Sequence, residues 1–128
     1  MADESAAETR KGWDMTDLVN YFEVGTPDPE AARAFYGGVF GWEFSAPGPA
    51  GYGFVNGNAG GLWDTTEADG GHWAVFYVEV ADIHATLDAA KSAGAGVVLP
   101  LVDNGTILFA HLSDPAGNRF GVWQRKAD

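Results

Sequence analysis

Residues 58–63 read Asn-Ala-Gly-Gly-Leu-Trp, and residues 118–123 read Asn-Arg-Phe-Gly-Val-Trp. The Asn, the second Gly, an aliphatic residue and the Trp lie in register in the two stretches. Two short strands can match by chance, so the residues around them must carry the same order before a duplication is inferred.

On either side of both stretches, the expected elements occur twice in one order. Asp28 and Asp82 are good N-caps, and Pro29 suits a first helical position. Apolar and aromatic runs between Gly and Pro punctuation indicate the strands. The first half is a strand at 18–24, a helix from Asp28 to Gly41, and strands at 42–45, 52–56 and 60–63. The second half is a strand at 72–80, a helix from Asp82 closed by Gly94 or Gly96, and strands at 97–102, 106–112 and 119–124. The chain therefore predicts βαβββ written twice.

Length and composition are those of one globular domain. The chain has 128 residues, of which 46% are hydrophobic and 13% aromatic, enough to bury a core. We expect a flexible acidic tail over 1–16 and a single domain over 17–125, with modules at about 17–66 and 71–125.

Charge and residue usage exclude several classes of function. A net charge of −11 argues against nucleic acid, whose phosphates require a basic surface. No apolar run has the length of a membrane span or signal peptide, so no membrane partner and a cytoplasmic location are expected. The absence of Cys excludes disulfides, thiolate zinc sites and a Cys nucleophile.

Two motifs resemble a known family. Residues 26–36, Thr-Pro-Asp-Pro-Glu-Ala-Ala-Arg-Ala-Phe-Tyr, followed by Phe-Gly-Trp at 40–42, look like the first strand-to-helix unit of the vicinal-oxygen-chelate (VOC) superfamily. Residues 113–118, Ser-Asp-Pro-Ala-Gly-Asn, resemble its last turn. This superfamily includes glyoxalases, bleomycin resistance proteins and dioxygenases. The resemblance implies an α+β fold in which two tandem βαβββ modules form a curled eight-stranded sheet around a cleft, with the helices on the convex side.

Side-chain alternation assigns residues to the two faces of this sheet. The convex set, expected to pack under the helices, is Phe22, Val24, Phe76, Val78, Val80, Phe120 and Val122. The opposite parity is more polar and aromatic, and it faces the expected cleft.

The resemblance also lets the metal site be tested. Metal-dependent members take four His, Glu or Gln ligands from the first and last strands of each module. Counting from the motifs and the repeat places Tyr21, Gly61, Val75 and Gly121 at those positions. These residues cannot supply a nitrogen and carboxylate shell, so no metal and no cofactor are expected. Gly61 and Gly121 would instead deepen the floor of the cleft. His72, His84 and His111 show no short ligand spacing that would indicate a relocated site.

Glu23 and His111 are the candidate catalytic residues, because both have cleft parity. His titrates near neutrality, and burial raises a carboxyl toward it, so the two would suit proton transfer. A structural hydrogen-bonded pair is the alternative.

The remaining candidates would bind a ligand by stacking and shape. They are Tyr21, Phe54, Gly61, Trp63, Val75, Tyr77, Phe109, Gly121 and Trp123, with Trp73 as a further aromatic candidate. Three functions follow: a metal-independent protein that sequesters or carries a small aromatic or cationic molecule, as bleomycin resistance proteins do; a metal-free isomerase, cyclase or lyase; or a structural or regulatory dimer. A homodimer is expected because small modules leave sheet edges exposed.

Overall fold

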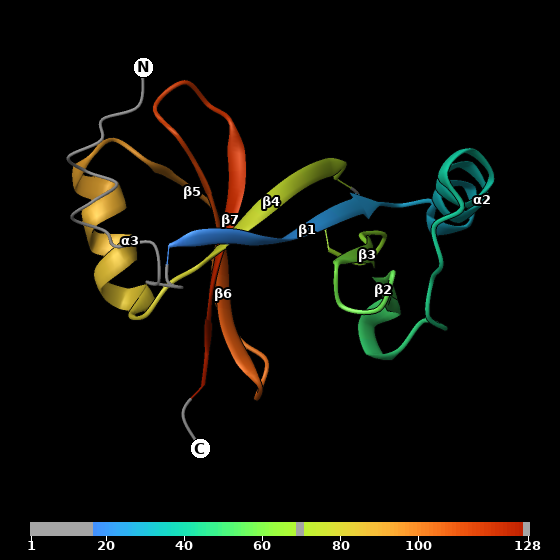
Figure 1. Ribbon diagram of the computed structural model, residues 1–128. Coiled ribbons are helices and arrows are strands. Elements are labelled where there is room, and N and C mark those ends of the chain that lie inside the picture. Colours follow the sequence, from blue (N-terminus) through green and yellow to red (C-terminus); the bar gives the residue numbers. More distant parts are fainter. Residues whose placement is uncertain (1–16, 69–70, 127–128) are drawn as a thin grey trace, which may run out of the picture.

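The computed structural model describes residues 17–68 and 71–126, so the expected tail over 1–16 lies outside the described residues. The described chain is α+β, with one seven-stranded mixed sheet and two α-helices (Figure 1). In chain order the elements are β1 (Leu18–Thr26), α2 (Pro29–Phe40), the 3-10 turn η1 (Pro49–Gly51), β2 (Tyr52–Val55), β3 (Gly60–Asp64), β4 (Trp73–Glu79), α3 (Ile83–Ser92), β5 (Gly96–Asp103), β6 (Ile107–Ser113) and β7 (Arg119–Arg125).

The sheet has the order β2-β3-β1-β4-β7-β6-β5. β1 and β4 pair antiparallel at its centre, and each has a parallel partner on its other side, β3 for β1 and β7 for β4. β2, β6 and β5 complete the sheet through antiparallel pairs. The sheet does not close, and β2 and β5 are its two edges.

The eighth expected strand, at 42–45, is wrong as a ladder strand. This segment makes an isolated bridge between Phe44 and Val55, flanked by hydrogen bonds from Ser45 N to Phe54 O and from Asn56 N to Glu43 O. Pro47 follows two residues after Ser45, and its lack of an N–H prevents the ladder from continuing.

Both helices begin at the expected caps. Asp28 Oδ1 accepts a hydrogen bond from Ala31 N, and Asp82 Oδ1 accepts one from Ala85 N. Gly41 ends α2 in the left-handed region at φ 71°, which explains why the chain has glycine there.

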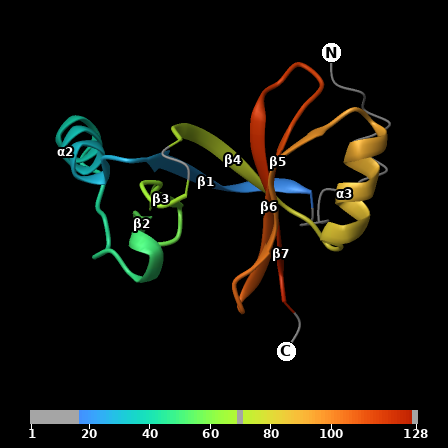
Figure 2. The same ribbon diagram turned by 180° about the vertical axis from the view of Figure 1, so that it is seen from behind.

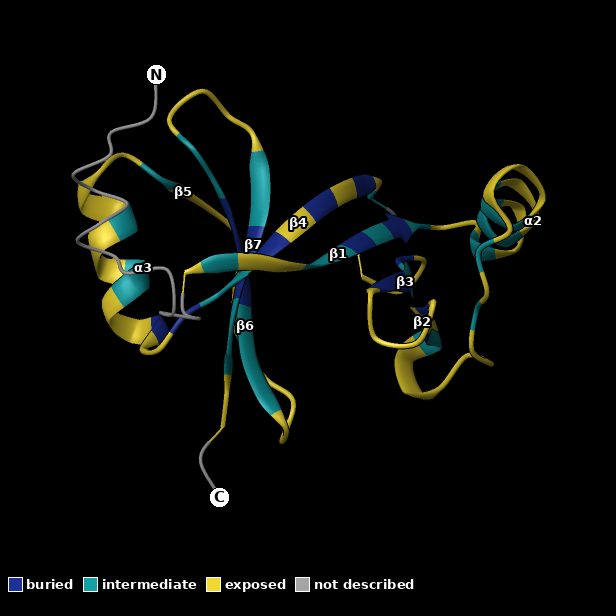
Figure 3. Ribbon diagram, viewed as in Figure 1, coloured by how far each residue is buried: buried dark blue, intermediate teal, exposed yellow. Residues whose placement is uncertain are grey.

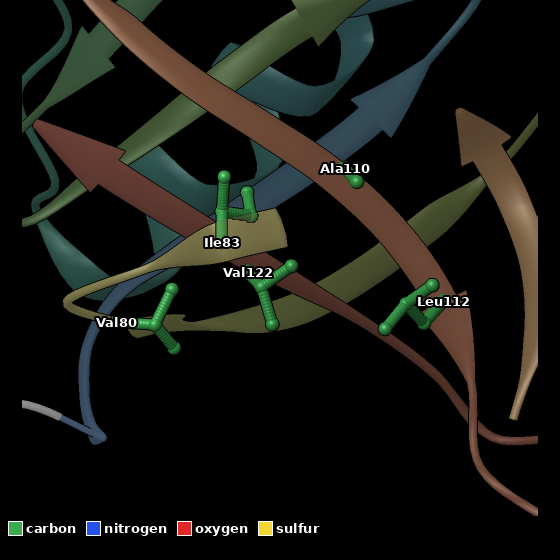
Figure 4. Close-up of a cluster of buried hydrophobic side chains, with 5 residues drawn as sticks. All are labelled: Val80, Ile83, Ala110, Leu112 and Val122. Atoms are coloured by element: carbon green, nitrogen blue, oxygen red, sulfur yellow. The ribbon is translucent and has the colours of Figure 1, made fainter. Parts of the chain in front are cut away.

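α3 covers one half of the sheet and closes its core. Ile83, at the start of α3, is fully buried against β6 and β7 (Figure 4). Burying such a side chain contributes about 1.5–3 kcal/mol. The buried cluster is Val80, Ile83, Ala110, Leu112 and Val122, and Val78 and Phe120 pack against it, as expected of the convex set.

α2 lies at the other end of the sheet, away from α3 (Figures 1 and 2). It buries no residue, and its surface remains largely exposed in Figure 3. Tyr36 on α2 stacks on Trp42, with 4.9 Å between the ring centroids. Phe76, expected beneath a helix, is 47% exposed, so that expectation is wrong. α2 packs beside β1 and β3 and leaves Phe76 on β4 uncovered.

Within the described parts of the chain, none of the helices is both long enough and apolar enough to span a membrane.

Candidate functional site

The sheet register brings the candidate residues onto one face. Glu23 on β1 lies opposite Val75 on β4 and Gly61 on β3. Tyr77 on β4 lies opposite Tyr21 on β1 and Gly121 on β7, and Gly121 lies opposite His111 on β6. Residues directly opposite one another on neighbouring strands project to the same side. Five strands, β1, β3, β4, β6 and β7, thus contribute residues to one side of the sheet.

Glu23 is the centre of a hydrogen-bond network, although it is only 3% exposed. Its Oε2 accepts a hydrogen bond of 2.8 Å from Trp73 Nε1, and its Oε1 accepts one of 3.0 Å from Tyr52 Oη. Tyr77 Oη lies 3.3 Å from both carboxylate oxygens. A buried carboxylate is costly unless donors satisfy it, and here three neutral donors do so.

His111 completes the other side of this network. Its ring is fully buried, and Nε2 lies 3.5 Å from Glu23 Oε2 and in contact with Tyr77 Oη. Nδ1 accepts a hydrogen bond of 2.9 Å from Arg119 Nε. Since a guanidinium can only donate, Nδ1 carries no proton and the ring proton lies on Nε2. The contact between His111 and Glu23 is therefore made by a neutral imidazole, not by an ion pair.

Tyr21 and Tyr52 extend the network away from Glu23. Their hydroxyl oxygens are 2.7 Å apart. Burial, with the negative charge of Glu23 adding to it, raises the pKa of Tyr21 to about 12. Burial also raises the pKa values of Tyr52 and Tyr77 above the ordinary value, and the charge of Glu23 again adds to the effect. All three phenols are therefore neutral donors near pH 7.

Gly61 and Gly121 make room for tyrosine side chains. A Cβ at position 61 would lie 1.7 Å from Tyr52 Oη and 2.6 Å from Tyr21 Oη. A Cβ at position 121 would lie 2.5 Å from Cε2 of Tyr77. The expectation that these glycines deepen a cleft floor is therefore wrong, because tyrosines of the same chain fill that space.

Aromatic side chains surround the network and form what we call the aromatic face. Trp63 contacts Trp73 and Phe109 edge-on, with ring centroids 5.5 and 6.4 Å apart. Phe54 lies on the edge strand β2, where it is 44% exposed and its ring centroid is 5.6 Å from that of Tyr52. The aromatic face consists of buried Trp73, Val75 and Tyr77 with half-buried Tyr21, Trp63, Phe109 and Trp123 around them.

Sequence reasoning missed Tyr52 and Arg119 and the role of Trp73 as a donor. Tyr52 has the strand parity of Phe54, and Arg119 has that of Gly121, so alternation could have found both. No sequence signal shows that Trp73 Nε1 reaches Glu23. The guanidinium carbon of Arg119 also lies 3.8 Å from the centroid of the Trp73 ring, a cation–π contact.

The residues present do not fit a transition-metal shell. Of the four positions tested, Tyr21 offers a phenol oxygen, while Gly61, Val75 and Gly121 offer no side-chain donor. No group of three or more His, Asp or Glu suited to a metal occurs among residues 17–68 and 71–126. The free lone pair of the His111 ring lies on Nδ1, where it accepts the hydrogen bond from Arg119 Nε. The ring cannot bind a metal through either nitrogen without losing that bond. His72, just before β4, and His84, on α3, are both exposed.

A separate open depression of about 500 Å³ lies beside α2. Its lining includes Val24 and Gly25 at the end of β1, Phe35 and Tyr36 on α2, and Ala74 on β4. It shares Trp73 with the aromatic face but does not contain Glu23 or His111.

Relatives with known names resemble this chain over most of its length. "Putative glyoxylase CFP32" from Mycobacterium bovis and the protein of the same name from Mycobacterium tuberculosis are each 28% identical over 127 residues, covering 82% of this chain. The chain spans only 44% of the length of these curated relatives.

Solved structures share the fold at low sequence identity. A glyoxalase/bleomycin resistance protein/dioxygenase superfamily member from Vibrio splendidus has a TM-score of 0.56 at 18% identity, covering 81% of this chain and 96% of that one. Methylmalonyl-CoA epimerase from Streptomyces coelicolor has a TM-score of 0.55 at 16% identity, covering 88% and 99%. The Mn(II)-bound glyoxalase from Novosphingobium aromaticivorans has a TM-score of 0.57 at 20% identity, covering 89% and 42%.

A family model gives the assignment directly. The model described as Glyoxalase/Bleomycin resistance protein/Dioxygenase superfamily matches residues 18–122, from the start of β1 to the buried part of β7. This range includes both helices, strands β1 to β6, the first part of β7 and every residue of the Glu23 network. The chain therefore belongs to the Glyoxalase/Bleomycin resistance protein/Dioxygenase superfamily.

Proposed function

We propose that this chain binds a small planar molecule on its aromatic face, without a metal, and sequesters or carries it. The observation that supports this most directly is the arrangement around Glu23. Half-buried Tyr21, Trp63, Phe109 and Trp123 pack against a buried cluster that contains Trp73 and Tyr77. Both of these residues lie against the buried carboxylate of Glu23, whose donors come from the chain itself. An aromatic surface beside a carboxylate whose hydrogen bonds are already satisfied suits ligand binding by stacking more than it suits catalysis.

The metal-free part of this proposal rests on the lack of metal-binding side chains at the four positions where metal-dependent members carry ligands, which here are Tyr21, Gly61, Val75 and Gly121. Elemental analysis of the purified protein is expected to find no stoichiometric transition metal. The metal-free proposal would be refuted if about one metal ion per chain were found and if a chelator removed both the metal and the ability to bind the ligand.

Ligand binding is tested by thermal shift with a panel of planar acids, amines and neutral aromatic compounds. A compound that binds the folded state raises the Tm by mass action. At a ligand concentration of one hundred times its Kd, the free energy of unfolding increases by about 2.7 kcal/mol. Trp63→Leu is expected to abolish this shift, whereas Trp42→Leu, outside the aromatic face, should retain it. Each variant is compared with its own ligand-free Tm, so its baseline stability does not enter. A complete absence of binding by the panel would contradict the function.

A metal-free enzyme of the isomerase, cyclase or lyase type is the second candidate, because Glu23 and His111 do lie 3.5 Å apart. In this alternative Glu23 would exchange a proton with substrate, and His111 would hold the carboxylate in place. The burial of both side chains ranks this reading below binding, since a substrate would have to displace Tyr52 or Tyr77. Turnover unaffected in both Glu23→Gln and His111→Ala would exclude the pair.

Four further statements stay predictions. A homodimer is supported by the open edge β5, where Val97 and Val98 are 47% and 43% exposed. A structural or regulatory dimer is the third candidate function. Descent from two tandem βαβββ modules, over about 17–66 and 71–125, is supported by the parallel pairs β1–β3 and β4–β7. The cytoplasmic location would be tested by fractionation of the source cells.

A further inference from the structure

The hydroxyl protons of Tyr21 and Tyr52 point in one direction, toward Glu23. Trp73 Nε1 can only donate, so Glu23 Oε2 accepts its hydrogen bond. Tyr52 Oη donates its single proton to the other oxygen of Glu23, Oε1, at 3.0 Å. With that proton used, the 2.7 Å contact between the two phenols requires Tyr21 to donate to Tyr52.

Tyr21 Oη is the outer end of this chain and has lone pairs left. Its bond to Tyr52 is the one hydrogen bond that its hydroxyl makes within residues 17–68 and 71–126. Because its proton is used inward, the oxygen can serve a ligand only as an acceptor. Tyr21 is half-buried at the border of the aromatic face, beside the rings that would hold the ligand.

The charge of Glu23 strengthens this acceptor. In a chain of O–H bonds that ends on an anion, each bond polarises the next, and electron density accumulates on the outer oxygen. On its other side the network includes Arg119, which donates to His111 and covers the Trp73 ring. The two sides of the network thus differ, with an acceptor oxygen at Tyr21 and a donating guanidinium at Arg119.

We propose that Tyr21 Oη recognises the ligand as a hydrogen-bond acceptor, and that the ligand is an aromatic molecule carrying a donor group such as a primary ammonium. The inference rests on the proposed ligand-binding function and specifies its substrate class. Stacking holds the ring of the ligand, while the N–H group donates to Tyr21.

The role of Tyr21 as a hydrogen-bond acceptor is tested with three small-molecule probes and three proteins. Benzylamine carries N–H donors at neutral pH, benzyltrimethylammonium is a cation without N–H, and benzoate is an anion that only accepts. Their affinities are measured by NMR titration at pH 7 with the unmodified protein, Tyr21→Phe and Tyr36→Phe. Tyr21→Phe removes only the end of the chain, since Tyr52 keeps its bond to Glu23. Tyr36, on α2, is the matched control, and circular dichroism confirms that both variants fold.

Benzylamine is expected to bind on the order of tenfold more tightly than benzyltrimethylammonium in the unmodified protein and in Tyr36→Phe, the size of one charge-assisted hydrogen bond. Tyr21→Phe should reduce this ratio to within about twofold by weakening benzylamine alone. Any steric difference between the two cations is common to all three proteins and cancels in the comparison.

An unchanged ratio in Tyr21→Phe, or benzoate binding as tightly as benzylamine, would overturn the inference. If none of the three probes binds while other planar compounds raise the Tm, the inference fails and the proposed function stands. If no compound of either set binds, both fail.

Discussion

At the scale of single residues, Glu23 and its tyrosine donors tie stability to pH. The pKa of Tyr21 is raised from 10.0 to about 12, and those of Tyr52 and Tyr77 are raised as well. Above pH 10 the unfolded chain loses phenolic protons that the folded protein retains, so the unfolded state gains stability relative to the folded state.

We therefore expect the tyrosines to make their full contribution to the free energy of unfolding below pH 10. The free energy of unfolding should then fall as the pH rises from 10 toward 12. Denaturant unfolding at successive pH values, with tyrosinate absorbance recorded on the same samples, measures this. Tyr21→Phe should show a shallower decline than the unmodified protein. A decline that begins well below pH 10 would show that other groups dominate.

Gly61 gives a prediction about packing. Gly61→Ala places a Cβ 1.7 Å from Tyr52 Oη, so the phenol must move and release Glu23. Overpacking together with the lost hydrogen bond should lower the free energy of unfolding by at least about 2 kcal/mol.

The matched control is Gly38→Ala on α2, where a Cβ would meet nothing within 4 Å. There alanine should leave stability unchanged or raise it by up to about 1 kcal/mol, since glycine is a poor helix former. Equal effects of the two substitutions, measured in urea, would contradict the assigned role of Gly61.

At the scale of elements, the two helices begin with the same kind of cap but differ in how they join the core. α3 buries Ile83 completely, whereas α2 buries no residue. Asp28→Ala and Asp82→Ala each remove a cap, at a cost of about 1 kcal/mol.

For Asp82→Ala we expect this cost in global unfolding by denaturant, because α3 unfolds with the core. For Asp28→Ala we expect little global change and faster amide hydrogen exchange confined to α2. Asp28→Asn and Asp82→Asn, which retain a capping oxygen, are the controls. An equal global loss in both alanine variants would show that α2 is held more firmly than its contacts indicate.

The elements also show how far sequence reasoning reaches. Caps, helix ends and strand parity are local, so Asp28, Gly41 and Asp82 could be assigned from the chain alone. The approach of Glu23 and His111 could be proposed from parity, but their separation depends on the order of strands across the sheet. Tyr52 filling the space over Gly61 could not be foreseen, because it requires knowing which strand lies beside β3 and in which register.

For the molecule as a whole, an open sheet edge favours self-association, whereas the strongly acidic composition opposes it. β5 is a long edge strand whose Val97, Val98 and Leu101 are 47%, 43% and 36% exposed. Such an edge can pair with a second copy of the chain. A net charge of −11 opposes self-association at long range, and salt screens that repulsion.

We expect dimers whose dissociation constant falls as ionic strength increases. Val98→Lys should weaken association by tenfold or more, on the order of 1–2 kcal/mol, because it places a charge in the paired edge. Val39→Lys adds the same charge on exposed α2 and is the control. Sedimentation equilibrium over a range of concentrations measures both, and a protein that stays monomeric throughout would refute the edge interface.

The glycines beneath aromatic rings also constrain the order in which this sequence can change. At positions 25, 61 and 121 any side chain would collide with Trp73, Tyr52 or Tyr77, respectively. A histidine or glutamate at position 61 becomes tolerable only after Tyr52 has been replaced by something smaller, and that first step already removes a donor from Glu23. A route toward a metal-binding relative therefore passes through an intermediate with a less satisfied buried carboxylate. A change between the two kinds of site by single substitutions therefore passes through less stable intermediates.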